Sequence, residues 1–424
     1  MSFLRPGGGS GGGGGAGRVA GYGGLAPVRR GPGAPGGPAF GRRSLVGRAL
    51  AKDSVVRHMD WVLILAVLAL ALIGTLLVWS ATRTALAQAG ANPNTYLEKQ
   101  LLNIAIGLAL MIGVSLIHYR VLRVYTPLVY VAACLGLLAV LSPLGTTVNG
   151  AHSWISLPGG FQIEPSEYAK IGMIMMLAVI LGGLRDRATR PGLPEVGLAL
   201  ACGAVPLLLV ALQPDLGVVV LLLVLLVGII VVSGVRLRWL VALGVAGTLA
   251  GLAVWSLHVL KPYQMRRLTA FVNPSADPLG AGYSAAQAKI AIGSGRMFGQ
   301  GLFHGQLVAG NFVPEQHTDF IFSVAGEELG FVGAITIVAL LAIVLVRAIR
   351  IAARADDMFG LLVASGIAIW FAAQSFVNIG MTIGITPVTG LPLPFVSYGG
   401  SAMFADLIAV GVLLAVHRRH RVFD

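Results

Sequence analysis

Residues 61–80 read WVLILAVLALALIGTLLVWS, a stretch without one charged side chain. A helix needs about 17 to 25 apolar residues to cross a bilayer, so this stretch predicts a transmembrane helix. Further apolar runs of spanning length follow along the chain, at 100–117, 122–142, 167–183, 196–212, 216–233, 238–258, 319–346, 358–381 and 401–416. The predicted fold class is therefore all-α, a polytopic membrane protein with ten transmembrane helices.

The composition of the chain agrees with this prediction. Of its 424 residues, 56% are hydrophobic and 11% are charged, whereas a soluble domain has about 25% charged residues. The net charge of +13 does not indicate a nucleic-acid partner, because most Lys and Arg residues lie in short connections between the apolar runs. Cys134 and Cys202 fall inside apolar runs, which favours two small buried side chains over a disulfide.

The basic residues also predict a topology. They cluster before the first run and after the second, fourth, sixth, eighth and tenth runs, so the positive-inside rule places these connections and both termini in the cytoplasm. The large connection after the seventh run, about 259–318, is expected on the extracytoplasmic side. Residues 1–54 are rich in Gly, Pro and Arg and predict a disordered cytoplasmic tail, which leaves 55–424 as the transmembrane domain.

The 259–318 connection is the first candidate for a functional site. It is basic although the positive-inside rule disfavours Lys and Arg on the extracytoplasmic side, so its cations are expected to have a use. Its cations include Arg266, Arg267, Lys289 and Arg296, and a cationic loop beside a membrane suits an anionic substrate. It also carries Asp277, set between prolines and glycines. On the residues alone, an aspartate here could equally cap the helix that follows.

Ionisable residues also enter the apolar runs. Glu164, Glu167 and Lys170 would share one face of a helix that begins near Pro165. Charged groups in a membrane usually face a cavity or each other, so either a structural ion pair or a substrate site fits. In QPDLG, residues 213–217, Pro and Gly flank an acid and predict a tight turn or a broken helix in which the carboxylate accepts from freed amides.

Two further motifs lie next to apolar runs. PEQHTDF, residues 314–320, contains His317, and a single histidine at a membrane interface is more often structural than catalytic. PVTGLPLPFVSYGGS, residues 387–401, is apolar but full of helix breakers, which membranes tolerate only where the segment is packed in protein or lines a cavity. No Walker loop, dinucleotide fingerprint or zinc-spaced cluster occurs, so neither ATP nor a redox cofactor is indicated.

Taken together, five ordered motifs resemble those of the SEDS family, the shape, elongation, division and sporulation proteins typified by RodA and FtsW. The resemblance covers residues 55–420, with a RodA-like member favoured by overall similarity. One departure is Glu164, where the family usually has Gln. The motifs are NGAHSWISLPGGFQIEPSEYAK (149–170), QPDLG (213–217), NPSADPLGAGYSAAQAKIAIGSG (273–295), PEQHTDFIFSVAGEELG (314–330) and GLPLPFVSYGGS (390–401).

The resemblance implies a peptidoglycan glycosyltransferase that polymerises lipid II at the outer face of the cytoplasmic membrane, with a class B penicillin-binding protein as its transpeptidase partner. Asp277 matches the family's catalytic acid and would be the general base. The residues expected to bind substrate are Arg266, Arg267, Lys289 and Arg296 at the diphosphate, Glu167 and Lys170 in a central cavity, and His317 and Ser397 within the family motifs.

Three questions stay open on the sequence. A divalent cation, Mg²⁺ or Mn²⁺, could assist the basic residues at the diphosphate, since no cofactor is certain. A lipid II flippase would also suit broken helices and intramembrane charges, but it needs no acid such as Asp277 outside the membrane. If the protein is only a scaffold that activates the penicillin-binding protein, the acidic residues of the 259–318 connection should be dispensable.

Overall fold

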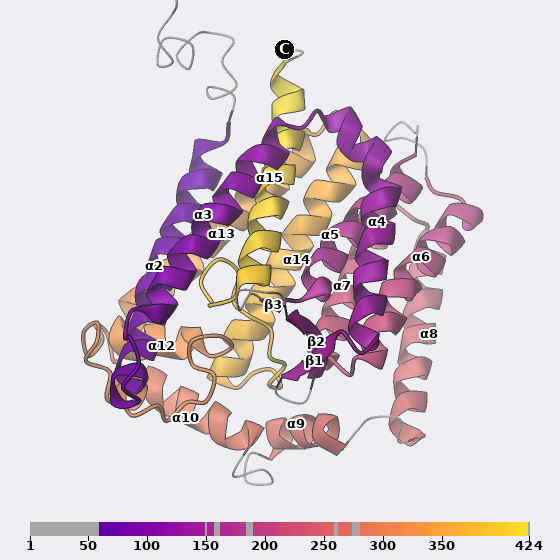
Figure 1. Cartoon of the computed structure of the whole chain (residues 1–424). Coiled ribbons are helices and arrows are strands. Elements are labelled where there is room, and N and C mark those ends of the chain that lie inside the picture. The colour runs from indigo at the N-terminus through magenta and orange to yellow at the C-terminus, as the bar shows by residue number, and fades with distance from the viewer. Residues whose placement is uncertain are drawn as a thin grey trace, which may run out of the picture. The chain divides into compact units, whose positions relative to one another are not determined.

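The computed structural model describes residues 59–148, 151–156, 162–183, 190–257, 262–273 and 280–422, and these are almost entirely helical (Figure 1). The all-α class is confirmed, and the predicted tail, 1–54, lies outside the described residues. The elements are α2 (Trp61–Gln88), α3 (Thr95–Leu116), α4 (Tyr119–Leu141), β1 (Gly145–Val148), β2 (Ala151–Ser156), β3 (Gln162–Ile163), α5 (Pro165–Gly182), α6 (Leu193–Leu212), α7 (Leu216–Val232), α8 (Leu237–Ser256), α9 (Pro262–Val272), α10 (Ala281–Ser294), α11 (Gln306–Ala309), α12 (Ile321–Glu328), α13 (Gly330–Arg354), α14 (Met358–Ile383) and α15 (Gly400–Val422).

Eight of the described helices are long and apolar enough to cross a membrane, namely α2, α3, α4, α5, α6, α13, α14 and α15. Two shorter apolar helices, α7 and the Leu237–Ala253 part of α8, coincide with the sixth and seventh predicted runs. The multi-pass membrane class is therefore confirmed, while a total of ten crossing helices stays a prediction.

The run predicted at 319–346 is divided in the structure into α12 and α13. The break falls at Gly330, whose φ of 67° is in the left-handed region that favours glycine. A Cβ atom on Gly330 would stand 2.2 Å from the backbone nitrogen of Gly299, so the chain bends where another segment packs closely against it. The predicted single helix is therefore wrong at this point, because the break depends on a distant contact.

Carboxylates at the helix ends explain where several helices begin. Asp60 accepts a hydrogen bond from Leu63 N (3.2 Å) at the start of α2 and pairs with Arg347 of α13 (2.6 Å). Asp215 accepts from Val218 N (3.1 Å) at the start of α7, which confirms the predicted role of this acid at freed amides. Each cap satisfies an amide that the helix itself leaves without an acceptor.

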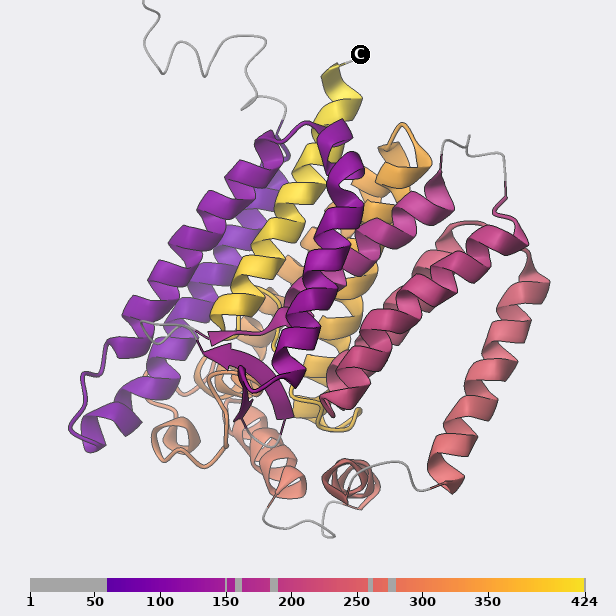
Figure 2. The same cartoon turned by 45° about the vertical axis from the view of Figure 1, so that its right-hand side comes forward.

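The helices form an inner and an outer group. Within the spanning windows, 78% of residues are buried in α5 and α15 and 61% in α14, against 22% in α4 and α13. The outer helices keep apolar side chains on their exposed faces, as lipid contact requires. Figure 2 shows α8 standing apart from α6 and α7, and both views show α9 and α10 lying across one end of the bundle. This end, where α5 begins and α14 ends, is called the site end below.

A small antiparallel sheet, β1-β2-β3, lies in the connection between α4 and α5. Gly145 pairs with Ile155, and Ile155 pairs in turn with Ile163. The sheet leads the chain directly into α5, whose first residue is Pro165. The predicted start of this helix near Pro165 is confirmed, since proline is favoured at the first helical position.

Candidate functional site

The central feature of the bundle is a buried ion pair on α5. Lys170 Nζ lies 2.6 Å from Glu167 Oε2, and the two side chains are 0% and 1% exposed. Lys170 also donates to Gln374 Oε1 on α14 (3.0 Å) and lies 4.6 Å from the ring centroid of Trp370. The predicted shared helix face is thus confirmed for Glu167 and Lys170, whereas Glu164 precedes the helix as its N-cap residue. The lysine is fixed by two helices.

Side chains of the buried core hold the α14–α15 connection, residues 384–399. Gln374 Nε2 donates to Pro392 O (2.8 Å), and Asn378 Nδ2 donates to Leu391 O (2.7 Å). Asp406 of α15 accepts from the backbone nitrogen of Phe395 (3.2 Å). Irregular backbone is tolerated in a membrane protein only where protein groups satisfy it, so this segment is packed in protein, as the sequence allowed.

The sequence did not single out Gln374 and Asn378. Both amides lie in the apolar run 358–381, four positions apart, and therefore on one face of α14. Polar side chains at that spacing inside an apolar run were the signal that could have identified them.

The structure places Ser397 inside the α14–α15 connection. Its hydroxyl donates to Thr318 O (2.6 Å) and accepts from Leu393 N (2.8 Å). The side chain is 5% exposed. These bonds join the connection to the segment before α12, and a contact of Ser397 with substrate stays a prediction.

His317 lies in an aromatic cluster beside Ser397. Its ring centroid is 5.0 Å from that of Tyr96 and 5.8 Å from that of Tyr398, and its carbonyl accepts from Tyr398 N (3.0 Å). Burial lowers the pKa of His317, and the negative charge of Glu315 raises it by a smaller amount. Burial therefore favours the neutral imidazole, which packs as an aromatic group, and the substrate role of His317 stays a prediction.

Two of the predicted cations line one small pocket at the site end. Arg267 of α9 and Lys289 of α10 face the end of α14, and Arg267 Nη1 donates to Thr389 O (3.0 Å). The cavity measures about 30 Å³, which holds about one water molecule, so a larger anion would need the walls to move. The remaining lining residues are Ala270, Phe271, Ala281, Ala285, Gly384, Thr386, Pro387 and Val388.

The other two predicted cations do not line this pocket. Arg266 is exposed on α9. Arg296 is exposed beyond the end of α10, where its carbonyl accepts from Phe331 N (2.9 Å) at the start of α13. The structure therefore brings Arg267 and Lys289 together but leaves Arg266 and Arg296 on the surface.

Asp277 lies outside the described residues. The next helix, α10, begins at Ala281 with Gly280 at its N-cap. The capping alternative would therefore require Asp277 to act from upstream of the N-cap position.

Glu164 occupies the N-cap of α5 beside the ion pair. Burial, with Glu167 and then Asp215 adding to it, raises the pKa of Glu164 to about 8. Its backbone nitrogen donates to Ser401 Oγ of α15 (2.9 Å). This carboxyl group is therefore mainly neutral at pH 7 and resembles the glutamine that the family motif usually carries here.

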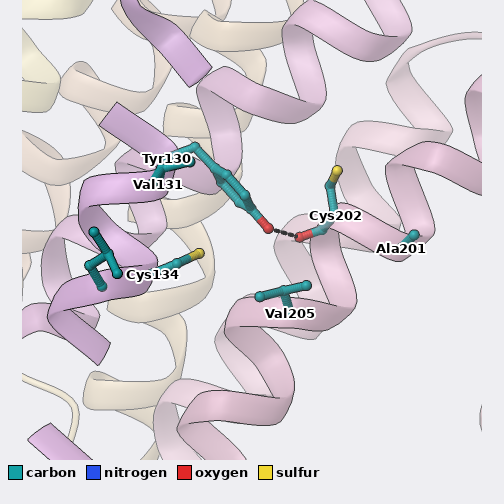
Figure 3. A pocket seen from close by; sticks show the side chains of 7 residues that line it. Tyr130, Val131, Cys134, Ala201, Cys202 and Val205 are labelled. Atoms are coloured by element: carbon teal, nitrogen blue, oxygen red, sulfur yellow. Dashed lines mark hydrogen bonds between the residues drawn. The ribbon is translucent and has the colours of Figure 1, made fainter. Parts of the chain in front are cut away.

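A larger hollow, about 310 Å³, lies between α4 and α6 and contains none of the predicted site residues. Both cysteines line it. Both are free, as predicted, but they are half-buried rather than buried, because they face this hollow. Figure 3 shows Tyr130 of α4 donating to the Cys202 carbonyl of α6 (2.6 Å). Pro206, four residues further on, has no N–H to bond that carbonyl, so Tyr130 replaces the missing helical donor.

These features define a multi-pass helical membrane protein with a buried ion pair in its core and a basic pocket at one end. The FtsW/RodA/SpoVE family model, described as a cell cycle protein, matches residues 60–422. The chain therefore belongs to this family, and the resemblance found in the motifs is confirmed.

Relatives and solved structures agree with this assignment. The chain is 38% identical over 368 residues to the peptidoglycan glycosyltransferase MrdB of Escherichia coli K12, covering 87% of this chain and 95% of that protein. A chain from the structure titled "Structural coordination of polymerization and crosslinking by a peptidoglycan synthase complex" superposes with a TM-score of 0.71 at 31% identity, covering 86% of this chain and 98% of that one. The rod shape determining protein RodA of Thermus thermophilus gives a TM-score of 0.62 at 29% identity, with the same coverage.

Proposed function

We propose that this protein is a peptidoglycan glycosyltransferase that polymerises lipid II into glycan strands at the outer face of the cytoplasmic membrane. The observation that carries the proposal, beyond family membership, is the pocket that Arg267 and Lys289 line together at the site end. Two cations from different helices at the edge of a membrane suit the diphosphate of a lipid-linked sugar.

The reaction is a displacement at the anomeric carbon of the donor sugar. The acceptor hydroxyl forms the new C–O bond, its proton passes to a base, and the diphosphate leaves with the electron pair of the broken C–O bond. Asp277 is the proposed base, and a positioned base contributes about 10² to 10⁴-fold. Arg267 and Lys289 would neutralise the leaving diphosphate, so that no strong general acid is needed.

The Glu167–Lys170 pair supports or positions the substrate and transfers no proton. Because Gln374 connects Lys170 to the α14–α15 connection, the pair is part of the frame behind the pocket. Arg266, Arg296, His317 and Ser397 keep the role of predicted substrate contacts. A Mg²⁺ or Mn²⁺ ion at the diphosphate is compatible with this chemistry; in the described part of the chain, no group of three potential metal ligands comes together.

The proposed partner is a class B penicillin-binding protein that supplies the transpeptidase, supported by the likeness to a chain of a peptidoglycan synthase complex. A role in cell elongation is preferred over division, and the likeness to RodA supports it. We place residues 1–54 and both termini in the cytoplasm.

The direct test is polymerisation of labelled lipid II by the purified protein, alone and with its partner. Asp277→Asn keeps the size of the side chain but loses the base, so glycan formation should fall about 10²-fold or more while partner binding persists. Near-normal synthesis by this variant would contradict the catalytic assignment. Lipid II translocation without polymer would favour a flippase, and activity that arises only in the partner would favour a scaffold.

The orientation is tested with single cysteines in a protein whose Cys134 and Cys202 have been replaced. Thr269 of α9 and Arg236 before α8 are both exposed. An impermeant thiol reagent added to intact cells should label a cysteine at Thr269 and spare one at Arg236. The reverse pattern would move the proposed site to the cytoplasmic side.

A further inference from the structure

Asp319, just before α12, lies near Arg267 of the basic pocket, although it is not one of the residues that line that pocket. The position of Asp319 can be described relative to Gly390 of the α14–α15 connection. A Cβ atom on that glycine would stand 3.4 Å from Asp319 Oδ2 and 3.9 Å from Arg267 Nη1. The carboxylate and the guanidinium therefore lie against the same point of the connection.

Both groups are held in place from their own sides. Arg267 Nη1 donates to Thr389 O (3.0 Å), next to Gly390. The carbonyl of Asp319 accepts from Asn378 Nδ2 (2.8 Å) and its nitrogen donates to Glu315 O (3.1 Å). These bonds fix the backbone of Asp319, while its carboxylate lies on the side of Gly390 and Arg267.

The charges that act on Asp319 come from three parts of the chain. Burial raises the pKa of this carboxyl group to about 7, Glu315 of its own segment adds to the rise, Arg267 of α9 opposes it, and Asp215 at the start of α7 adds to it. Thr318, whose hydroxyl also donates to Glu315 Oε2 (3.2 Å), lowers this pKa and favours the charged form of Asp319. Asp319 can therefore exchange its proton near physiological pH.

We propose that Asp319 is a positioning residue that sets how much of the Arg267 charge is available to the diphosphate of the donor. When Asp319 is ionised, its carboxylate competes with the phosphate oxygens for the guanidinium. When it is protonated, the competition ends and the anion binds more tightly. This inference rests on the proposed function, since it assumes a diphosphate in the pocket of Arg267 and Lys289.

The sign of the effect follows from the raised pKa. Below about pH 7 the neutral form of Asp319 prevails, and above it the carboxylate prevails. Affinity for the anionic donor should therefore fall as pH rises through about 7. The diphosphate of lipid II is doubly substituted and has no proton to gain or lose in this range, so the change belongs to the protein.

The experiment is the KM for lipid II and the kcat of the purified complex with its penicillin-binding partner, between about pH 6 and about pH 8. In the wild type, KM should rise several-fold across this range. Asp319→Asn should give a low KM that no longer changes with pH, with kcat near that of the wild type. Asp319→Glu keeps a carboxyl group at this position and should therefore retain the pH dependence of KM. A residue that only stabilised the fold would not remove the pH dependence of KM alone.

Two further variants sharpen the test. Glu315→Gln removes the charge that helps to raise the pKa of Asp319, so the rise in KM should begin at lower pH. Glu98→Gln removes an exposed carboxylate from the first turn of α3 and should leave the wild-type profile unchanged.

A wild-type pH profile retained by Asp319→Asn would overturn the inference. If Asp319→Asn fails to fold, the shift expected in Glu315→Gln decides the question, and an unshifted profile there would also overturn it. A wild-type protein that polymerises lipid II with a constant KM refutes the role of Asp319 alone. A wild-type complex that neither binds nor polymerises lipid II refutes the proposed function as well.

Discussion

The α14–α15 connection and the α9–α10 arm, defined as helices α9 and α10, meet at the site end but are held there differently. The connection belongs to the main core through Leu391, Leu393, Phe395 and Val396, and side chains of the core bond its backbone. In the arm, Ala288 and Ala291 pack in a second, small cluster, and Ile292 packs against the main core. The ion pair thus lies behind a wall whose backbone is bonded by core side chains. The wall that carries Lys289 is held by apolar packing in these two clusters, and we expect it to move more easily.

This difference explains how a pocket of about 30 Å³ can belong to a site for a diphosphate. Segments with few buried apolar contacts open at low free-energy cost. We therefore expect the arm to move when the anion enters, while the α14–α15 connection stays in place. The fixed side orients the substrate, and the movable side brings the cations to the leaving group.

The largest expected effect comes from breaking the fixed side at Lys170. Lys170→Met leaves Glu167 buried without its partner, which costs about 3 to 5 kcal/mol. We expect a large loss of thermal stability and of polymerisation, measured on the purified protein. Lys99→Met, at an exposed position on α3, is the matched control. Equal stability of the two variants would show that the pair does not hold the core.

A smaller effect is expected on the movable side. Arg267→Ala removes a charge-assisted contact worth roughly 1.5 to 3 kcal/mol, so kcat/KM for lipid II should fall about tenfold to a hundredfold. Arg266→Ala, at a predicted substrate contact that is exposed and does not line the pocket, should give a smaller loss. Thermal unfolding of both variants checks that folding is intact. A larger loss in Arg266→Ala than in Arg267→Ala would move the diphosphate out of the pocket.

The close approach of α2 to the α14–α15 connection gives a third test. A Cβ atom on Gly74 would stand 2.4 Å from the Val396 carbonyl oxygen, whereas one on Gly113 of α3 would meet nothing within 4 Å. Gly74→Ala should therefore cost about 1 to 3 kcal/mol and reduce polymerisation by displacing the connection. Gly113→Ala should leave activity unchanged and should not destabilise the protein, since alanine is favoured over glycine inside a helix by about 0.5 to 1 kcal/mol. If Gly74→Ala behaves like its control, the connection is less rigid than its contacts indicate.

The sequence predicted those features that depend on neighbours along the chain. The apolar runs, the helix start at Pro165, the shared face of Glu167 and Lys170, and the cap at Asp215 follow from local spacing. The approach of Arg267 to Lys289 and to Asp319 does not, because it joins α9 to segments distant in sequence. The break at Gly330 was missed for the same reason, since it depends on Gly299.

The smallest expected effect on polymerisation belongs to Glu164, beside the fixed ion pair. With a pKa of about 8, this carboxyl group is mainly neutral at pH 7, so Glu164→Gln replaces one neutral group by another of the same size. Activity at pH 7 should stay near that of the wild type.

Stability provides the sharper readout for Glu164. A carboxyl group with a raised pKa in the folded state makes the protein lose stability as pH rises from about 5 to about 8, because the unfolded chain releases the proton first. Wild type should therefore lose thermal stability over this range relative to Glu164→Gln, whose amide does not titrate. Glu98→Gln, at an exposed site, should follow the wild-type curve. Parallel curves for wild type and Glu164→Gln would show that Glu164 is already ionised beside Glu167, and the fixed side would then carry one more negative charge.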